Sequence, residues 1–303
     1  MIFKIKKDIK FSDFYKKLNV LSLLLIIFSI FILSYKGLNL GVDFKGGTLI
    51  EIRSENSEIT IGELRQSFLK MNLGDVTVKK FGKVDDYLVK IELSNNKDEN
   101  FIKSINDKLS SDLGSEINFR RVENVGPKVS AELLRSGVIA IILSLAAMLF
   151  YIWIRFEWQF SLGAIVALLH DVLITLGVFS LFNLEINLSI VAAVLTIVGY
   201  SMNDTVVIFD RVRENLKKFS DIKIFNLTNI SINETLSRTI ITSVTTLLAL
   251  LSIYFLGGEI LKGFSLAMIL GVIFGTYSSI YIANPILVLL KVSQRTIVKE
   301  DKD

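Results

Sequence analysis

Long apolar runs separated by short charged segments dominate the pattern of this chain. A transmembrane helix needs about 20 largely apolar residues. Six runs are long enough, namely Leu18–Tyr35, Leu133–Trp153, Phe160–Phe182, Leu188–Phe209, Arg238–Leu256 and Phe264–Leu290. The first run follows several lysines, as a secretion signal does, but no small-residue cleavage pattern comes after it, so we interpret it as an uncleaved anchor. The pattern predicts an α-helical polytopic membrane protein with six transmembrane helices.

A segment of ordinary polarity separates the first two runs. Its apolar positions switch between the period of a strand and the period of a helix. The predicted elements are Thr48–Arg53, Ile61–Met71, Val76–Phe81, Tyr87–Leu93, Phe101–Leu113 and Ile117–Val125. The order β-α-β-β-α-β predicts an α+β ferredoxin-like domain. We find no metal, nucleotide or catalytic motif in this segment, which favours a folded docking module over an enzyme domain.

These patterns divide the chain into five parts. They are a basic N-terminus (1–17), the first transmembrane helix (18–35), the α+β domain (36–126), a five-helix transmembrane bundle (127–290) with a loop over 210–237, and a tail (291–303). Lysine and arginine concentrate in the N-terminus, the loop and the tail. The positive-inside rule therefore predicts that both chain ends are cytoplasmic and that the α+β domain lies outside. A charge excess at a membrane face is no argument for nucleic-acid binding.

The composition excludes several kinds of site. The chain is 51% hydrophobic, has no cysteine and contains a single histidine, His170. Disulfides and thiolate metal sites are therefore excluded, and a histidine-rich metal centre is excluded as well. We expect neither a metal nor a cofactor.

An acidic residue, Asp204, lies inside the fourth apolar run. A charge at such a position costs about 2.5–3.5 kcal/mol on insertion scales, so it needs a partner or a proton. Measured inward from the outer edges of their runs, Asp204 lies at about 24 Å and Arg238 at about 27 Å, from the rise of 1.5 Å per residue. This similar depth predicts that the two charges are neighbours. Tyr200 and Asn203 share a helix face with Asp204, and Thr242 shares one with Arg238.

The residues alone leave the role of these charges open. Asp204 and Arg238 form either a structural ion pair that fixes the helix register, or a proton-exchanging carboxylate beside a fixed charge, because arginine keeps its proton. A second ionisable pair, His170 and Asp171, lies in the third run. Bonding across helices is the simpler explanation for that pair, and support of proton passage is the alternative.

Two glycine-containing junctions flank the predicted α+β domain. The first, Gly41–Gly47, contains Asp43, Gly46 and Gly47, residue types that allow a sharp turn off the membrane. The second, Gly126 and Pro127, precedes a helical run and places proline where a helix start loses no hydrogen bond. We expect both junctions to act as hinges or rigid joints.

Six motifs occur in order along the chain. They are GVDFKGGT (41–48), VGPKVSAELLRSG (125–137), RFEWQFSLGAIVALLHDV (155–172), VGYSMNDTVVIFDRVREN (198–215), SRTIITSVTTL (237–247) and GTYSSIYIANP (275–285). Together they resemble the SecD/SecF family of bacterial protein-export membrane subunits, on its SecF side. That family belongs to the resistance–nodulation–division superfamily. The resemblance covers nearly the whole predicted fold.

The resemblance implies a multi-pass subunit of the bacterial inner membrane with a periplasmic domain. It implies that the chain, with SecD, uses the proton-motive force to complete preprotein translocation, without hydrolytic chemistry of its own. The implied wider complex contains the SecYEG channel, SecA and a YajC-like accessory subunit. The translocating preprotein and membrane lipids are further expected partners, and no nucleic acid is expected. The aspartate and arginine that the family uses for proton passage fall on Asp204 and Arg238.

Two other functions compete with this expectation. One is a transporter half of the same superfamily that exports a lipid or a drug, but such a pump should show a large, pocketed external domain. The other is an assembly scaffold whose charges only pack helices. A scaffold predicts that substitutions at Asp204 and Arg238 lower the abundance of the complex and leave turnover unchanged.

Overall fold

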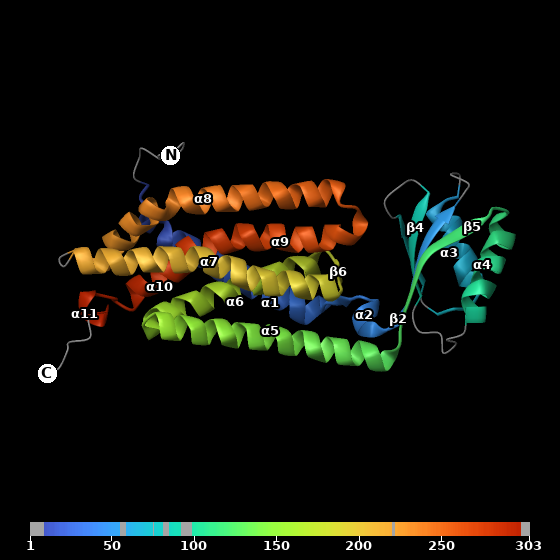
Figure 1. Ribbon diagram of the computed structural model, residues 1–303, viewed down its shortest axis with the longest axis horizontal. Helices are drawn as coiled ribbons and strands as arrows, with labels where there is room; N and C mark the ends of the chain where they lie inside the picture. The colour runs from blue at the N-terminus through green and yellow to red at the C-terminus, as the bar shows by residue number, and fades with distance from the viewer. Residues whose placement is uncertain are drawn as a thin grey trace.

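A computed structural model describes residues 9–54, 59–74, 76–80, 85–91, 99–219 and 222–297. The molecule is elongated, with long helices side by side in one part and a sheet with two helices at one end (Figure 1). Within these ranges, six helical segments are long and apolar enough to cross a membrane. The predicted six-helix membrane architecture is therefore confirmed.

The membrane helices differ from the apolar runs mainly at their ends. Their bounds are α1 Tyr15–Lys36, preceded by the 3₁₀ turn η1 Phe11–Phe14, then α5 Pro127–Arg155, α6 Trp158–Leu181, α7 Leu188–Lys218 and α8 Ile224–Leu256. The sixth span consists of α9 Glu259–Ser278, the π-helical turn η2 Ser279–Ala283 and α10 Asn284–Leu289, and a short helix α11 Gln294–Ile297 follows.

The segment 210–237, predicted as a loop, is mostly helical. Helix α7 continues to Lys218 and α8 begins at Ile224. Arg211 on α7 donates to Glu234 on α8 at 2.6 Å, and Asn215 donates to Ser231 at 3.0 Å. Because these polar groups pair across the two helix extensions, both helices continue beyond their apolar stretches. Hydropathy located the end of the apolar run, which is not the end of the hydrogen-bonded helix.

The α+β domain has the predicted element order. Its elements are β2 Gly47–Ser54, α3 Ile61–Lys70, β3 Val76–Lys80, β4 Asp86–Ile91, α4 Glu99–Leu113 and β5 Ile117–Val125. The strands form one antiparallel sheet in the order β3-β4-β2-β5. This βαββαβ arrangement agrees with the expected ferredoxin-like topology. The predicted strand ends at Phe81 and Leu93 lie outside the described residues.

The core of this domain follows from strand alternation. Ile50 and Ile52 of β2 point to the side covered by the helices and are buried with Leu64 and Phe68 of α3. Helix α3 starts with a capping box. In it, the N–H and hydroxyl of Thr60 donate to the Glu63 carboxylate and hold its pKa below the ordinary value.

A two-stranded parallel ribbon joins membrane helices at the bundle end next to the α+β domain. It pairs β1 Asn39–Leu40, which follows α1, with β6 Glu185–Ile186, which lies between α6 and α7. The backbone N–H of Gly41 donates to the carbonyl of Ile186 at 2.8 Å. A Cβ at Gly41 would meet Glu185 Oε1 at 2.8 Å, so glycine allows this approach. The sequence pattern did not predict the ribbon.

Glycines on α9 bring that helix close to α7. A Cβ at Gly271 would lie 2.2 Å from Ile197, and a Cβ at Gly275 would lie 3.0 Å from Ser201. This small-xxx-small surface gives close backbone approach in a membrane, where van der Waals contact drives helix association. The α7–α9 contact is therefore a close one, and it positions groups inside the bundle.

Candidate intramembrane charge site

Asp204 lies where α7, α8 and α9 meet. Asp204 is only 3% exposed. The hydroxyl of Thr276 on α9 donates to Asp204 Oδ2 at 3.5 Å, and Ser243 of α8 is 2.7 Å from that threonine oxygen. Because Thr276 gives its only hydroxyl proton to the carboxylate, Ser243 donates to Thr276. The result is a short hydroxyl relay from α8 through α9 to Asp204.

Arg238 does not form a direct ion pair with Asp204. No contact within 4.0 Å joins the two side chains, both of which lie in the described part of the chain. The charge of Arg238 still acts on Asp204 through space. Arg238 itself is exposed on α8. The structure thus places the predicted pair in one region, with the acid inside and the base on the surface.

The supporting polar residues occupy different environments. Asn203 is exposed on α7, while the buried hydroxyl of Tyr200 has no hydrogen-bond partner among the described residues. Thr242 is half-buried, and its hydroxyl donates back to the carbonyl of Arg238 at 3.0 Å. Such back-bonding satisfies the hydroxyl within the helix. The hydroxyl of Thr242 on α8 therefore does not require water. The exposed side chains of Asn203 and Arg238 do need a polar neighbour.

His170 and Asp171 form a separate buried cluster. Both side chains have no exposed surface, and His170 Nδ1 lies 2.9 Å from Asp171 Oδ1. The hydroxyls of Ser201 on α7 and Ser278 on α9 donate to Asp171 Oδ2 at 2.6 and 2.8 Å. Asp171 thus bonds across helices, as the simpler of the two interpretations predicted.

Sequence reasoning missed the hydroxyl partners of both carboxylates. Thr276 and Ser278 lie in GTYSS of the sixth span, and Ser201 lies in GYSMND of the fourth. The sequence signal for these partners was a concentration of serine and threonine at the same membrane depth as the two carboxylates. Depth alone could not pair them, because pairing depends on how each helix is rotated.

The junctions of the α+β domain lie next to each other. Gly47 at the start of β2 pairs with the residue that ends β5, just before Gly126. Gly46 and Gly47 have φ of 80° and 131°, as the predicted sharp turn needs, whereas Gly126 has an ordinary φ of −72° and Pro127 begins α5.

Asp43 connects this joint to the helix of the site. It lies in α2 Val42–Lys45, and its Oδ2 accepts a hydrogen bond from the backbone N–H of Leu188 at 2.8 Å. A carboxylate at a helix N-terminus satisfies a free N–H and complements the helix dipole. Helix α7 therefore links the joint at one end to Asp204 further along.

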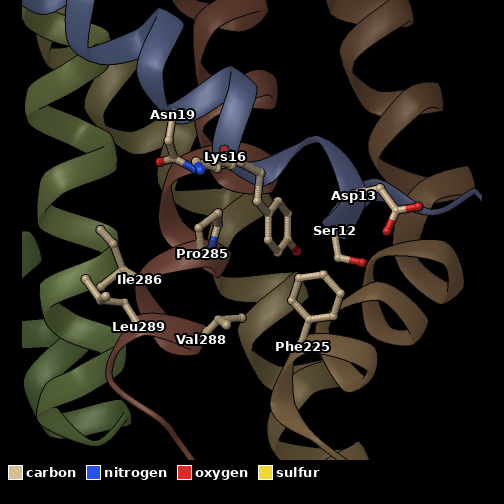
Figure 2. Close-up of a pocket in the computed structure, with 10 residues that line it drawn as sticks. Ser12, Asp13, Lys16, Asn19, Phe225, Pro285, Ile286, Val288 and Leu289 are labelled. Carbon is tan, nitrogen blue, oxygen red and sulfur yellow. Dashed lines mark hydrogen bonds between the residues drawn. The ribbon is translucent and has the colours of Figure 1, made fainter.

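Two cavities lie away from the two carboxylates. One of about 600 Å³ lies between the start of α1 and α10, with polar side chains on one side and apolar ones on the other (Figure 2). It is lined by Ser12, Asp13, Tyr15, Lys16, Asn19, Phe225, Pro285, Ile286, Val288 and Leu289. A second, of about 540 Å³, lies between the open sheet face and the nearby bundle end, and Asp43 lines it. Within the described ranges, we find no cluster of three or more potential metal ligands.

The fold and the charges define a class: a polytopic membrane protein with ionisable groups inside its bundle and a compact domain at one end. Residues 105–293 match the family model described as protein export membrane protein SecD/SecF, C-terminal, and residues 31–58 match the SecD/SecF GG motif. The chain belongs to the SecD/SecF family of protein-export membrane proteins. This confirms the resemblance seen in the motifs.

Named relatives agree. The protein translocase subunit SecF of Rickettsia rickettsii is 42% identical over 94% of this chain and 92% of its own length. That of Vibrio alginolyticus is 42% identical over 97% of this chain and 93% of its own length.

Two solved structures are similar as well. A crystal structure of SecDF from Thermus, titled a translocon-associated membrane protein, matches with a TM-score of 0.86 at 34% identity. SecDF in a super-membrane-facing form matches with 0.72 at 36%. Each comparison covers 96% of this chain and only 40% of the SecDF chain.

Proposed function

We propose that this chain is an auxiliary subunit of the Sec preprotein translocase that, with SecD, uses the proton-motive force in late stages of translocation across the bacterial inner membrane. The observation that carries the proposal is Asp204, an acid buried inside a membrane bundle and reached by a hydroxyl relay. An ionisable group there is costly to retain and indicates function. The chain contributes no hydrolytic chemistry of its own.

In this mechanism a proton moving inward binds Asp204 transiently and then leaves it. Moving one charge through 100 mV supplies about 2.3 kcal/mol, which is roughly 50-fold in an equilibrium constant. Arg238 stays protonated and acts as a fixed charge near the acid. Neutralising Asp204 removes the through-space attraction between its carboxylate and the exposed guanidinium of Arg238, which then interacts more strongly with another partner. The site then has two electrostatic states.

The joint passes this change to the α+β domain. Leu188, held by Asp43, and Asp204 lie on one continuous helix, about 24 Å apart from the rise per residue. Movement of α7 therefore reaches α2 and the adjacent strands β2 and β5. One SecDF structure is titled a super-membrane-facing form and matches this chain with a TM-score of 0.72, against 0.86 for the other, which is consistent with SecDF adopting more than one form.

A SecD partner completes the transporter. This chain covers 40% of the SecDF chain, and transporters of this kind combine two related halves. Exposed Asn203 and Arg238 supply the polar surface that such a second half would cover. The wider complex would include the SecYEG channel, SecA and a YajC-like subunit, with membrane lipids around it and the preprotein as client.

The distribution of positive charge supports one orientation. Lysine and arginine cluster at the end of the bundle opposite the α+β domain, in the segments 10–17 and 211–223. The positive-inside rule then places both chain ends in the cytoplasm and the α+β domain in the periplasm. That domain would act on polypeptide emerging from the channel.

The proposed function is tested with inverted membrane vesicles depleted of this chain and its SecD partner. We expect that adding both back restores completion of preprotein translocation only while a proton gradient is present. The measurement is the protease-protected, full-length preprotein over time, with and without an uncoupler. Equal restoration in the presence of the uncoupler would contradict gradient coupling.

The partner surface makes a second prediction, helped by the absence of cysteine from the natural chain. An Asn203→Cys variant should form a disulfide or maleimide cross-link to single-cysteine SecD in native membranes. A matched Leu143→Cys variant on α5, whose side chain is also exposed, should react with lipid-soluble maleimide but not cross-link. Cross-linking of both positions, or of neither, would argue against a partner seated on α7.

The assembly scaffold is the remaining alternative, and the buried Asp171 cluster gives it some support because it joins three helices. A scaffold requires that loss of charge at Asp204 lowers the amount of complex. Quantitative co-purification with SecD separates the two functions.

A further inference from the structure

The Asp171 cluster holds three membrane helices at one point. The carboxylate on α6 accepts one hydroxyl from Ser201 on α7 and one from Ser278 on α9, both at the same oxygen, Oδ2. His170 contacts the other oxygen, and its ring stacks on Tyr277 with centroids 5.9 Å apart. Two helices that share one acceptor atom cannot slide past each other without losing a hydrogen bond.

The helical turns of α7 and α9 that bind Asp171 also carry groups around Asp204. On α7, Ser201 lies one turn before Asp204 and Thr205. On α9, Ser278 lies two residues after Thr276, the donor to Asp204. The Thr276–Asp204 distance is 3.5 Å, at the outer limit for a hydrogen bond. A small change in the α7–α9 register therefore makes or breaks that contact.

A π-helical turn follows α9 directly after these residues. Turn η2 begins at Ser279, whose hydroxyl lies 2.8 Å from that of Thr205. Asn284 donates its side-chain amide to the carbonyl of Ser279 at 2.7 Å, which satisfies a backbone group inside the π turn. Single π turns interrupt helices at functional sites more often than elsewhere. Ser278 and Thr276 lie in the last turn of α9, directly before the π turn, where Ser278 donates to Asp171 and Thr276 donates to Asp204.

We propose that Asp171 is a positioning residue for Asp204: through Ser201 and Ser278 it sets the α7–α9 register that brings Thr276 to the Asp204 carboxylate. This inference rests on the proposed role of Asp204 in proton exchange. In it, Asp171 acts as a fixed double acceptor and exchanges no proton.

The polar and charged groups that face each carboxylate determine how its protonation depends on pH. Asp171 faces His170 from its own helix and the hydroxyls of Ser201 and Ser278 from the packed helices. Asp204 faces Thr276 of α9, and from α8 the hydroxyl of Ser243 and the charge of Arg238. A register change alters the second set without adding or removing a charge there.

The test follows the reactivity of Asp204 toward dicyclohexylcarbodiimide, which labels protonated carboxyl groups in membranes. The complete complex is labelled across a pH series, and the Asp204 peptide is quantified by mass spectrometry. The variants Ser201→Ala and Ser278→Ala each remove one hydroxyl and leave Asp171 itself unchanged. We expect each to move the pH midpoint of labelling by about half to one unit, the effect of one hydrogen bond.

Substitutions of Asp171 separate position from charge. Asp171→Asn keeps an oxygen that accepts both hydroxyls and an amide that can donate to His170, so the midpoint should stay near that of the natural chain. Asp171→Leu removes the acceptor and should shift the pH midpoint of labelling as the serine variants do. Thr175→Ala is the matched control, because that buried hydroxyl donates only within α6, to the Asp171 carbonyl. It should leave the midpoint unchanged.

The outcomes distinguish this inference from the proposed function. If Asp171→Asn moves the midpoint as far as Asp171→Leu, charge matters rather than position, and the inference is overturned. If the pH midpoint of labelling is unchanged in both serine variants, the inference is overturned as well. The serine variants alone decide the test if the Asp171→Leu protein does not accumulate. If export keeps its full gradient dependence in Asp204→Asn membranes while the serine variants shift the midpoint, the proposed function fails and the positioning role stands.

Discussion

The Asp204→Asn variant is expected to lose the gradient-dependent stage of export while still assembling with SecD. Asparagine has nearly the same shape and keeps an oxygen that accepts from Thr276, so packing at the α7–α9 contact should survive. It cannot take up and release a proton, so the roughly 50-fold bias that 100 mV supplies per charge is no longer available. We expect the gradient-driven completion rate to fall about tenfold or more.

The rate is measured in inverted vesicles as full-length, protease-protected preprotein, and assembly is measured by co-purification. Asp210→Asn is the matched control, a carboxylate-to-amide change on the same helix. Asp210 is about 44% exposed at its side chain and pairs with Arg155 at 2.9 Å. A surface ion pair contributes about 0–1 kcal/mol, so this variant should export normally. Full sensitivity of the Asp204→Asn membranes to an uncoupler would rule out the proposed role of Asp204.

The second large effect is expected at the α7–α9 contact. In Gly271→Ala the new Cβ would lie 2.2 Å from Cγ1 of Ile197, which is 1% exposed and cannot move aside freely. Overpacking of this kind costs about 1–3 kcal/mol. We expect a lower thermal midpoint of the purified complex and a lower yield of folded chain.

A double variant tests whether this clash is the cause. Ile197→Ala removes all three side-chain atoms that the new Cβ would meet, at a cost of about 2–5 kcal/mol by itself. Combined with Gly271→Ala it should be less destabilising than the sum of the single changes, because the two positions are in contact. Gly199→Ala is the control, since its Cβ would lie 4.0 Å from Met148. If the destabilisations of the two single changes simply add up in the double variant, the clash with Ile197 is not the cause of the lost stability.

The membrane part of the fold was largely readable from the sequence because lipid imposes a simple rule. Each span must present an apolar surface over a fixed length, so the runs located the six helices. The α+β domain was readable because period-2 and period-3.6 patterns alternate within it. The ends of α7 and α8 were not readable, because the Arg211–Glu234 pair supports helix beyond the apolar stretch.

The site was predicted only in part. The sequence identified Asp204, Arg238 and the His170–Asp171 pair, because any charge in an apolar run stands out. It expected Asp204 and Arg238 as neighbours from depth, and the structure places them in one region without a direct ion pair, with the acid buried against Thr276 and the arginine exposed. Depth follows from position in the chain, but the direction of a side chain around the helix axis depends on what that helix packs against.

The sequence by itself determined the number of membrane helices, the order of elements in the α+β domain, the family, and which ionisable groups lie within the membrane. Only the tertiary structure decided which hydroxyls meet each carboxylate, that a π turn follows Ser278, and that Asp43 contacts the start of α7. The first set depends on local composition and periodicity. The second depends on helix rotation and register, which are fixed by contacts such as Gly275 against Ser201 between segments far apart in the chain.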